Sequence, residues 1–193
     1  LYGAGLLSYR FREDGSVEVH HSLVPDRPMY RLGLTMRLPE VDRVRWYGKG
    51  PHENYIDRNH GALTAIHDLP LSELAHRYIR PQENGNRTEV RWLEAFGRGL
   101  VLRCADVTGD RLGFTAWPWT QEELDAAEHD HELVSGRQVT LNVDRRQRGV
   151  GGDLPGTAAL LPDYTIPAGQ LHEVTMRLSV EVAAPPAVPL TSG

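Results

Sequence analysis

Short runs in which apolar and polar residues alternate recur along this 193-residue chain. The first two runs extend from Tyr9 to Leu23 and flank an Asp14-Gly15 pair. A period of two places successive side chains on opposite faces of a strand, and an Asp-Gly pair between two such runs is a strong signal for a β-hairpin. The pattern therefore predicts antiparallel β-structure in which each strand buries one face.

Further strands are expected at 31–38, 44–46, 90–92, 100–104, 112–116, 139–143 and 174–180. The runs between 90 and 116 follow one another through glycine-containing turns, which predicts an antiparallel meander whose first strand contains Val90 and Trp92. Helix signals are few. A short helix is expected near Pro70, and another begins at Thr120, where Thr-Gln-Glu-Glu forms a capping box. The sequence predicts an all-β fold with one or two short helices.

Composition restricts the partners that the chain can have. At 40% hydrophobic residues and a net charge of −5, it can form one domain with a buried core, expected over residues 1–183 and followed by a proline-rich tail at 184–193. Its basic residues are scattered and no apolar run reaches the roughly 18 to 20 residues of a membrane span, so neither nucleic acid nor a membrane is an expected partner.

Cys104 is the single cysteine, which excludes an intrachain disulfide. It lies within an apolar alternation, so it is expected to be a buried structural thiol and not a nucleophile. A lone thiol suits a reducing compartment, and a cytoplasmic location is expected.

Two polar loops at 46–58 and 78–88 each follow an extended run. Loops at strand ends are where β scaffolds usually carry binding residues. Their carboxylates, amides and guanidinium groups could bind the vicinal hydroxyls of a sugar, or could instead hold the loops through turns and ion pairs. The candidate residues are Glu53, Asn54, Asp57 and Arg58 in the first loop, Glu83, Asn84, Asn86 and Arg87 in the second, and Asp144 on the polar face of the strand at 139–143.

No motif marks a catalytic or metal centre. Glycoside hydrolysis by the usual route needs two carboxyl groups at a fixed separation, and nothing in the sequence singles out such a pair. His129 and His131 do not share a helix face, so a metal site with Asp130 is not expected. The glycine cluster at 149–153 lacks the Lys-Ser/Thr pair of a phosphate loop and predicts either a flexible turn or a turn in which the backbone approaches a neighbour closely.

Three stretches resemble the signatures of a known family. WYGKGPHENYIDR at 46–58, PQENGNR at 81–87 and GVGGD at 149–153 resemble the C-terminal domain of large bacterial β-galactosidases of glycoside hydrolase family two. The resemblance covers about positions 6 to 182. It implies an antiparallel β-supersandwich of the galactose mutarotase-like kind.

The resemblance also implies a division of labour. In the family the catalytic glutamates lie on a separate (β/α)-barrel domain, so this chain is expected to pack on that barrel, to shape the rim of the active site for a carbohydrate substrate, and to be inactive alone. Gly152 and Asp153 join the candidate loop residues. No cofactor is expected in this chain, and Mg²⁺ and Na⁺ are implied only for the parent enzyme.

Two departures from the family pattern have consequences. Where relatives carry a tryptophan that lines the site for the leaving sugar, this chain has Gly156, so a preference for glucose as the leaving group is in doubt. The family domain begins several strands before Leu1, so the supersandwich is expected to be incomplete at its N-terminus, with exposed edges that could pair with another copy to form a homo-oligomer.

Two alternatives remain open. The chain could be a free-standing carbohydrate-binding module. It could also be a mutarotase, because that activity shares the fold and needs a general acid and base, commonly a histidine and a glutamate. Histidines stand in the relevant region, although none lies in a motif that matches a mutarotase: His52, His60, His67 and His76.

Overall fold

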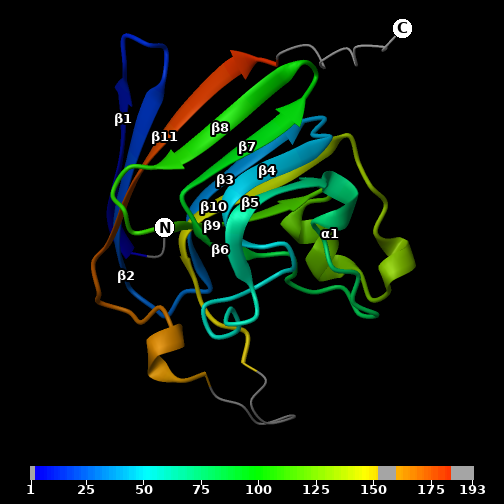
Figure 1. Ribbon diagram of the computed structural model, residues 1–193. Helices are drawn as coiled ribbons and strands as arrows, with labels where there is room; N and C mark the ends of the chain where they lie inside the picture. The colour runs from blue at the N-terminus through cyan, green and yellow to red at the C-terminus, as the bar shows by residue number, and fades with distance from the viewer. Residues whose placement is uncertain (1–2, 152–159, 184–193) are drawn as a thin grey trace, which may run out of the picture.

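Two antiparallel β-sheets pack against each other in the computed structural model, which describes residues 3–151 and 160–183 (Figure 1). The larger sheet has seven strands, in the spatial order β1 (Gly3–Phe11), β2 (Val17–Pro25), β11 (His172–Val182), β8 (Leu100–Asp106), β7 (Trp92–Gly97), β4 (Arg43–Gly50) and β5 (Leu63–Pro70). The smaller sheet has four, in the order β3 (Arg31–Pro39), β10 (Gln138–Gln147), β9 (Leu112–Trp117) and β6 (Arg87–Val90). The predicted all-β, sandwich-like fold is confirmed.

Alternation along the strands builds the core between the two sheets. Trp46 of β4 and Phe114 of β9 are fully buried, and their rings meet edge to face with centroids 5.4 Å apart. Cys104 is also buried in this core, and burial raises the pKa of its thiol to about 12. The prediction of an inert structural cysteine is therefore confirmed.

The β1–β2 hairpin also forms as predicted. Arg10 pairs with Glu18 in its register, and Gly15 supplies the left-handed turn with φ 79°. The side chain of Asp14 closes the turn, because its Oδ1 accepts hydrogen bonds from the Ser16 backbone amide at 2.9 Å and from the Ser16 hydroxyl at 2.6 Å.

The predicted meander between 90 and 116 is confirmed in its middle, where β7 and β8 pair antiparallel, but it is wrong at both ends. Val90 ends β6 in the smaller sheet, whereas Trp92 begins β7 in the larger sheet, so these residues do not share a strand. The chain then returns to the smaller sheet between β8 and β9. Alternation indicates which residues are buried but not which of two facing sheets a strand joins. The chain first crosses between the sheets after Glu89, which has a φ of 54°, and because this residue is not a glycine the sequence does not mark the break.

Short helical segments lie at one end of the sandwich. Helix α1 (Gln121–Ala126) begins at the predicted capping box, in which Glu123 N donates to Thr120 Oγ1 at 3.1 Å and Thr120 N donates to Glu123 Oε2 at 2.7 Å. Its Leu124 packs against Trp117 and Trp119. The helix expected near Pro70 is a single 3₁₀ turn, η1 (Leu71–Glu73), and the preceding strand β5 was not predicted because it is an exposed edge strand with no buried face.

The two remaining 3₁₀ turns are η2 (Asp130–Glu132) and η3 (Pro162–Tyr164). Among residues 3–151 and 160–183, no helix is long and apolar enough to cross a membrane. The expected tail at 184–193 lies outside the described residues.

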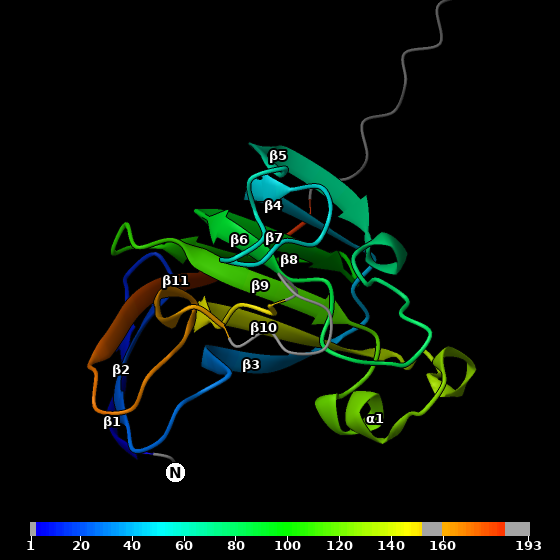
Figure 2. The ribbon, with the colours of Figure 1, turned by 90° about the horizontal axis from the view of Figure 1, so that it is seen from below.

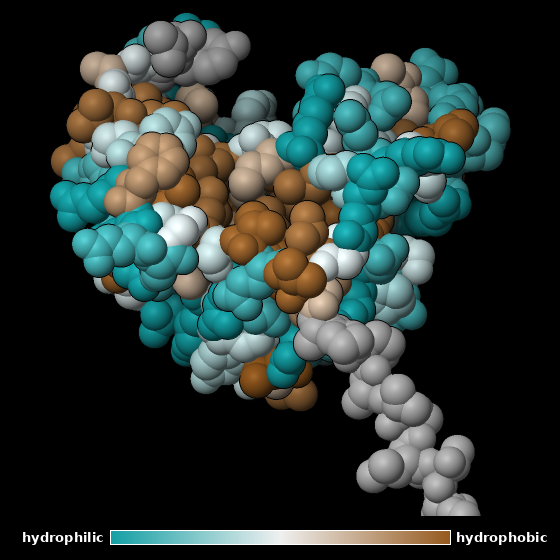
Figure 3. All heavy atoms as spheres, turned by 90° about the horizontal axis from the view of Figure 1, so that it is seen from above, coloured by the Kyte–Doolittle hydropathy of each residue, from teal (hydrophilic) through white to brown (hydrophobic). Residues whose placement is uncertain are grey.

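Apolar side chains gather in a hollow on the face that Figure 3 shows from above. Half-buried side chains of β3 and β11, among them Leu38 and Leu178, pack against the margin of the core. Beside them β11 and β8 present Val180, Val182 and Leu100 to solvent, and Val182 pairs with Leu100 across the two strands. The sandwich therefore exposes a continuous apolar surface as well as its polar loops.

Candidate functional site

The two polar loops lie against each other beyond the end of β4 and beside β6 (Figure 2). Asn54 N donates to Asn86 O at 2.7 Å, and Asn86 Nδ2 donates back to Asn54 O at 2.9 Å. Asn54 Oδ1 accepts from both the backbone amide and the hydroxyl of Thr88, at 2.9 and 2.6 Å. Both asparagines are 1% exposed, so these amides connect the loops instead of facing a solvent-borne ligand.

Glu53 fastens the same pair of loops. Its Oε2 accepts from the backbone amide of Gly85 at 2.8 Å, and its Oε1 accepts from the hydroxyl of Tyr78 and from Arg58 Nη2, the latter at 3.1 Å. Burial, followed by the neighbouring Glu53 carboxylate, raises the pKa of Tyr78. Because both carboxylate oxygens of Glu53 are engaged, the residue has the contacts of a structural anchor.

Arg87 binds three separate turns of backbone. Its guanidinium donates to the carbonyl oxygens of Leu74 at 2.7 Å, Gly85 at 2.6 Å and Pro51 at 2.8 and 3.1 Å, and it lies over the Trp46 ring at 5.5 Å. The residue is 2% exposed, and burial lowers its pKa to about 10. Since that value is well above neutrality, Arg87 stays cationic and holds the loops as a charge-assisted clip.

Asn84 completes the second loop. Its Oδ1 accepts from the backbone amide of His76 at 3.1 Å, its Nδ2 donates to Gln82 O at 2.9 Å, and its own carbonyl accepts from Trp117 Nε1 at 3.1 Å. The indole thereby connects the loop to the smaller sheet.

The third signature stretch docks on the first loop through Asp57. Gly151 N donates to Asp57 Oδ2 at 2.8 Å, and a Cβ at Gly149 would lie only 2.3 Å from the same carboxylate oxygen. The expectation of a close-approach turn is therefore confirmed at Gly149. Gly152, Asp153 and Gly156 lie outside the described residues.

Asp144 is not on a solvated face, contrary to the prediction. It is 1% exposed, because β10 is a central strand covered on both faces. Arg31 Nη2 lies 2.9 Å from Asp144 Oδ2 and 3.6 Å from Glu83 Oε1, and it donates to Gln147 Oε1 at 3.2 Å. Arg31 and Gln147 were not predicted as site residues, because only the fold brings β3, β10 and the second loop together.

Glu83, Asp144, Arg31 and Gln147 form an acidic cluster, and all of them but Asp144 line a cleft of about 590 Å³ together with Tyr30 and Arg148. Burial raises the pKa of Asp144 to about 7, and Arg31 opposes that effect only in part. Burial likewise raises the pKa of Glu83. One guanidinium therefore lies against two carboxyl groups, the buried Asp144 and the half-buried Glu83, and burial favours the protonated form of each.

Metal and histidine chemistry find little support in the part of the chain that the structure describes. No group of three histidine, cysteine or acidic side chains there could hold a metal ion. His52 and His76 line a pocket of about 230 Å³ together with Glu53. That carboxylate is already occupied by Tyr78, Arg58 and Gly85, so it is not a free general base.

Comparison with known proteins gives a consistent result. The family model described as "Beta galactosidase small chain" matches residues 5–178. A "Beta-galactosidase" of Priestia megaterium (strain DSM 319 / IMG 1521) is 35% identical over 179 residues, which are 89% of this chain and 17% of that protein. A "Beta-galactosidase" of Vibrio cholerae serotype O1 (strain ATCC 39541 / Classical Ogawa 395 / O395) is 34% identical over 159 residues, 82% of this chain and 15% of that protein.

A third relative, a "Beta-galactosidase" of Arthrobacter sp. (strain B7), is 36% identical over 141 residues, 70% of this chain and 14% of its own length. The chain thus spans between 14% and 17% of the length of these curated relatives.

Removing the Arg87 clip should destabilise the domain. Arg87→Met leaves the carbonyls of Leu74, Gly85 and Pro51 without their donor in a buried place, so we expect the free energy of unfolding to fall by about 3 kcal/mol or more. Urea denaturation measures the change. The control is Arg80→Met on the exposed part of the same loop, expected to change stability by less than about 0.5 kcal/mol. Equal effects of the two substitutions on the free energy of unfolding would contradict the role of Arg87 in holding the loops.

The acidic cluster predicts a pH dependence of stability. The folded-state pKa of Asp144 is raised above its unfolded value, so the folded state binds more protons between about pH 4 and pH 7, and stability falls as pH rises through this range. In Asp144→Asn, the free energy of unfolding should fall less between pH 4 and pH 8, by an amount on the order of 2–4 kcal/mol. Denaturation of both proteins across this range tests it. Parallel pH profiles would show that Asp144 titrates normally.

Proposed function

The chain belongs to the β-galactosidase small-chain family, and from this membership we propose that it is an accessory domain of a β-galactosidase that hydrolyses terminal β-D-galactosides. In this proposal the carboxylates that break the glycosidic bond lie on another part of the enzyme, the catalytic barrel. The domain packs on that barrel and shapes the rim of the active site for its carbohydrate substrate.

One observation carries the proposal: three signature residues of the polar loops, Glu53, Asn54 and Arg87, make hydrogen bonds that hold the loops themselves. Glu53 has both oxygens occupied, Arg87 binds backbone carbonyls, and Asn54 bonds to Asn86 and Thr88. A glycosidase nucleophile or acid needs a carboxyl group that can reach substrate. The loops therefore support a role in shape and not in bond breaking.

Coverage of the relatives supports the same division. The relatives that carry the name "Beta-galactosidase" are about six to seven times as long as the segment they share with this chain, because that segment is 14% to 17% of each. The exposed apolar surface of β8 and β11 is the kind of surface that another domain covers, since soluble proteins rarely leave large apolar patches open. We assign this surface to contact with the rest of the enzyme or with a second copy of the chain.

In this proposal, residues 149–151, which Asp57 holds in place, connect the polar loops to the rim of the active site. Asp57 fixes Gly151, and the chain continues from there into the segment that contains Gly156. Glycine offers no aromatic surface for the leaving sugar, so the enzyme should discriminate weakly among leaving groups. We propose no cofactor for this chain, assign any Mg²⁺ or Na⁺ to the catalytic part, and propose a cytoplasmic location because its lone thiol suits a reducing compartment.

A domain exchange tests the accessory role. Residues 5–178 would replace the matching segment of the Priestia megaterium β-galactosidase, and hydrolysis of a chromogenic β-galactoside would be measured. We expect turnover by the chimera, none by the 193-residue chain alone, and none by the relative with the segment deleted.

Turnover by the isolated chain would contradict the proposal, and so would full activity of the deletion variant. The Arg87→Met chimera serves as a control for shape, because it should lose activity together with thermal stability.

A further inference from the structure

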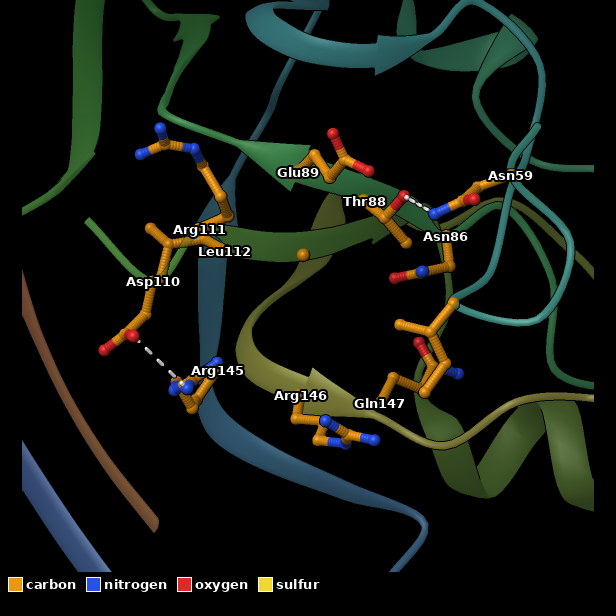
Figure 4. A pocket seen from close by; sticks show the side chains of 12 residues that line it. Asn59, Asn86, Thr88, Glu89, Asp110, Arg111, Leu112, Arg145, Arg146 and Gln147 are labelled. Atoms are coloured by element: carbon orange, nitrogen blue, oxygen red, sulfur yellow. Dashed lines mark hydrogen bonds and ion pairs between the residues drawn. The ribbon is translucent and has the colours of Figure 1, made fainter. Parts of the chain in front are cut away.

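A small polar pocket of about 210 Å³ opens on the smaller sheet where β6, β9 and β10 meet the first polar loop (Figure 4). Asn86 and Thr88 line it from the β6 side, Gly113 from β9, Arg146 from β10 and Ile56 from the loop. The accessory role assigns nothing to this pocket, which shares Gln147 with the acidic cluster but is lined by none of the charged members of that cluster.

Two irregularities in strand pairing create the pocket. On β6, Arg87 pairs with Phe114 and Val90 pairs with Leu112, so two residues of β6 lie opposite Gly113 alone. On β10, the pairing with β9 stops at Asp144 opposite Gly113, and the register with β3 shifts after Asp144. Both neighbours of β9 therefore depart from regular pairing at one point. Such bulges are over-represented beside functional sites.

Gly113 keeps the floor of the pocket open. A Cβ at this position would lie 3.2 Å from Arg87 O and 3.4 Å from Asn86 Oδ1, so any side chain would occupy the space in front of that amide. Two non-glycine residues that line the pocket, Glu89 with φ 54° and Arg111 with φ 67°, adopt the left-handed backbone conformation. Such backbone is unfavourable and is found where the surrounding structure maintains it.

Two buried polar atoms of the pocket have no hydrogen-bond partner among the described residues. One is Asn86 Oδ1, an acceptor on a side chain that is only 1% exposed, and Figure 4 shows its amide pointing into the pocket. The other is Arg146 Nε, a donor. A buried acceptor and a buried donor without partners are each unfavourable, and a ligand that carries both donors and acceptors would satisfy them.

Hydroxyl groups meet both needs, because one can donate to Asn86 Oδ1 and another can accept from Arg146 Nε. The lining carries two carboxylates and three guanidinium groups. Asp110 Oδ1 lies 3.5 Å from Arg145 Nη2, and Lys49 lies 3.1 Å from Glu89, so neither carboxylate is free to bind a cation. A fully ionised anion is not favoured either, because it offers no donor to Asn86 Oδ1. Ile56 and Leu112 add apolar surface suited to C–H groups.

We propose that this pocket binds a neutral polyhydroxylated ring of monosaccharide size. Its volume is below the roughly 300 to 1,000 Å³ of sites for drug-sized ligands, which matches one sugar ring and excludes a longer oligosaccharide. The site does not depend on the accessory role, since it is formed by residues of this chain alone.

Titration of the ¹⁵N-labelled 193-residue chain with D-galactose, D-glucose and myo-inositol tests the proposal. We expect saturable shifts of the Gly113 and Thr88 amides and of the Asn86 side-chain amide, with a dissociation constant on the order of 1 mM for at least one ring. Gly113→Ala should weaken binding at least tenfold. The matched control, Gly61→Ala, places its methyl group in open space and should bind like the wild type.

A second pair of variants covers the case in which Gly113→Ala does not fold. Ile56→Trp fills the pocket from its rim and should abolish the shifts, whereas Ile66→Trp, on the exposed face of β5, should leave them unchanged. Three results would overturn the proposal: no shifts with any of the three rings, shifts only outside the pocket, or shifts that persist in Ile56→Trp. Ordered water would then be the partner of the unpaired atoms.

Discussion

A single buried guanidinium organises the polar end of this sandwich. Arg87 joins the carbonyl oxygen of Pro51 in the β4–β5 connection to those of Leu74 and Gly85 near the two ends of the β5–β6 connection, and its guanidinium lies over the ring of Trp46 in the core. A buried cation is tolerated only where its donors are satisfied, so the positions of the two connections depend on each other. The hydrogen bonds between Asn54 and Asn86 and the contacts of Glu53 extend from this arrangement.

Roles in shape and roles in chemistry are therefore separated in this domain. The residues that make its loops recognisable as family signatures are largely those that hold the loops, and Asp57 extends the same network to Gly151. Two buried atoms of the network itself, Asn86 Oδ1 and Asp57 Oδ1, have no hydrogen-bond partner among the described residues, and neither has Arg146 Nε in the neighbouring pocket. A rigid polar scaffold of this kind can position neighbouring elements, which is what an accessory domain contributes to a catalytic one.

Much of the secondary structure could be predicted from the sequence, because alternation, the Asp14-Gly15 turn and the capping box at Thr120 are local signals. Sheet membership could not, since Val90 and Trp92 alternate as one strand would while the chain crosses between sheets at Arg91. The two candidate loops do contact each other, but the burial of Asp144 was missed because it depends on β3 and β9 covering both edges of β10. Arg31 and Gln147 carry no sequence signal of their own.

The central claim is that the carboxylates of the signature loops maintain shape and do not break bonds. It is tested most directly by measuring kcat for β-galactoside hydrolysis by the complete enzyme with Glu53→Gln or Glu83→Gln in this domain, corrected for the folded fraction. The account predicts that kcat stays within about tenfold of the wild-type value while thermal stability falls, because a positioned general acid or base typically contributes about 10²- to 10⁴-fold. A loss of about 10³-fold in kcat with stability unchanged would contradict it.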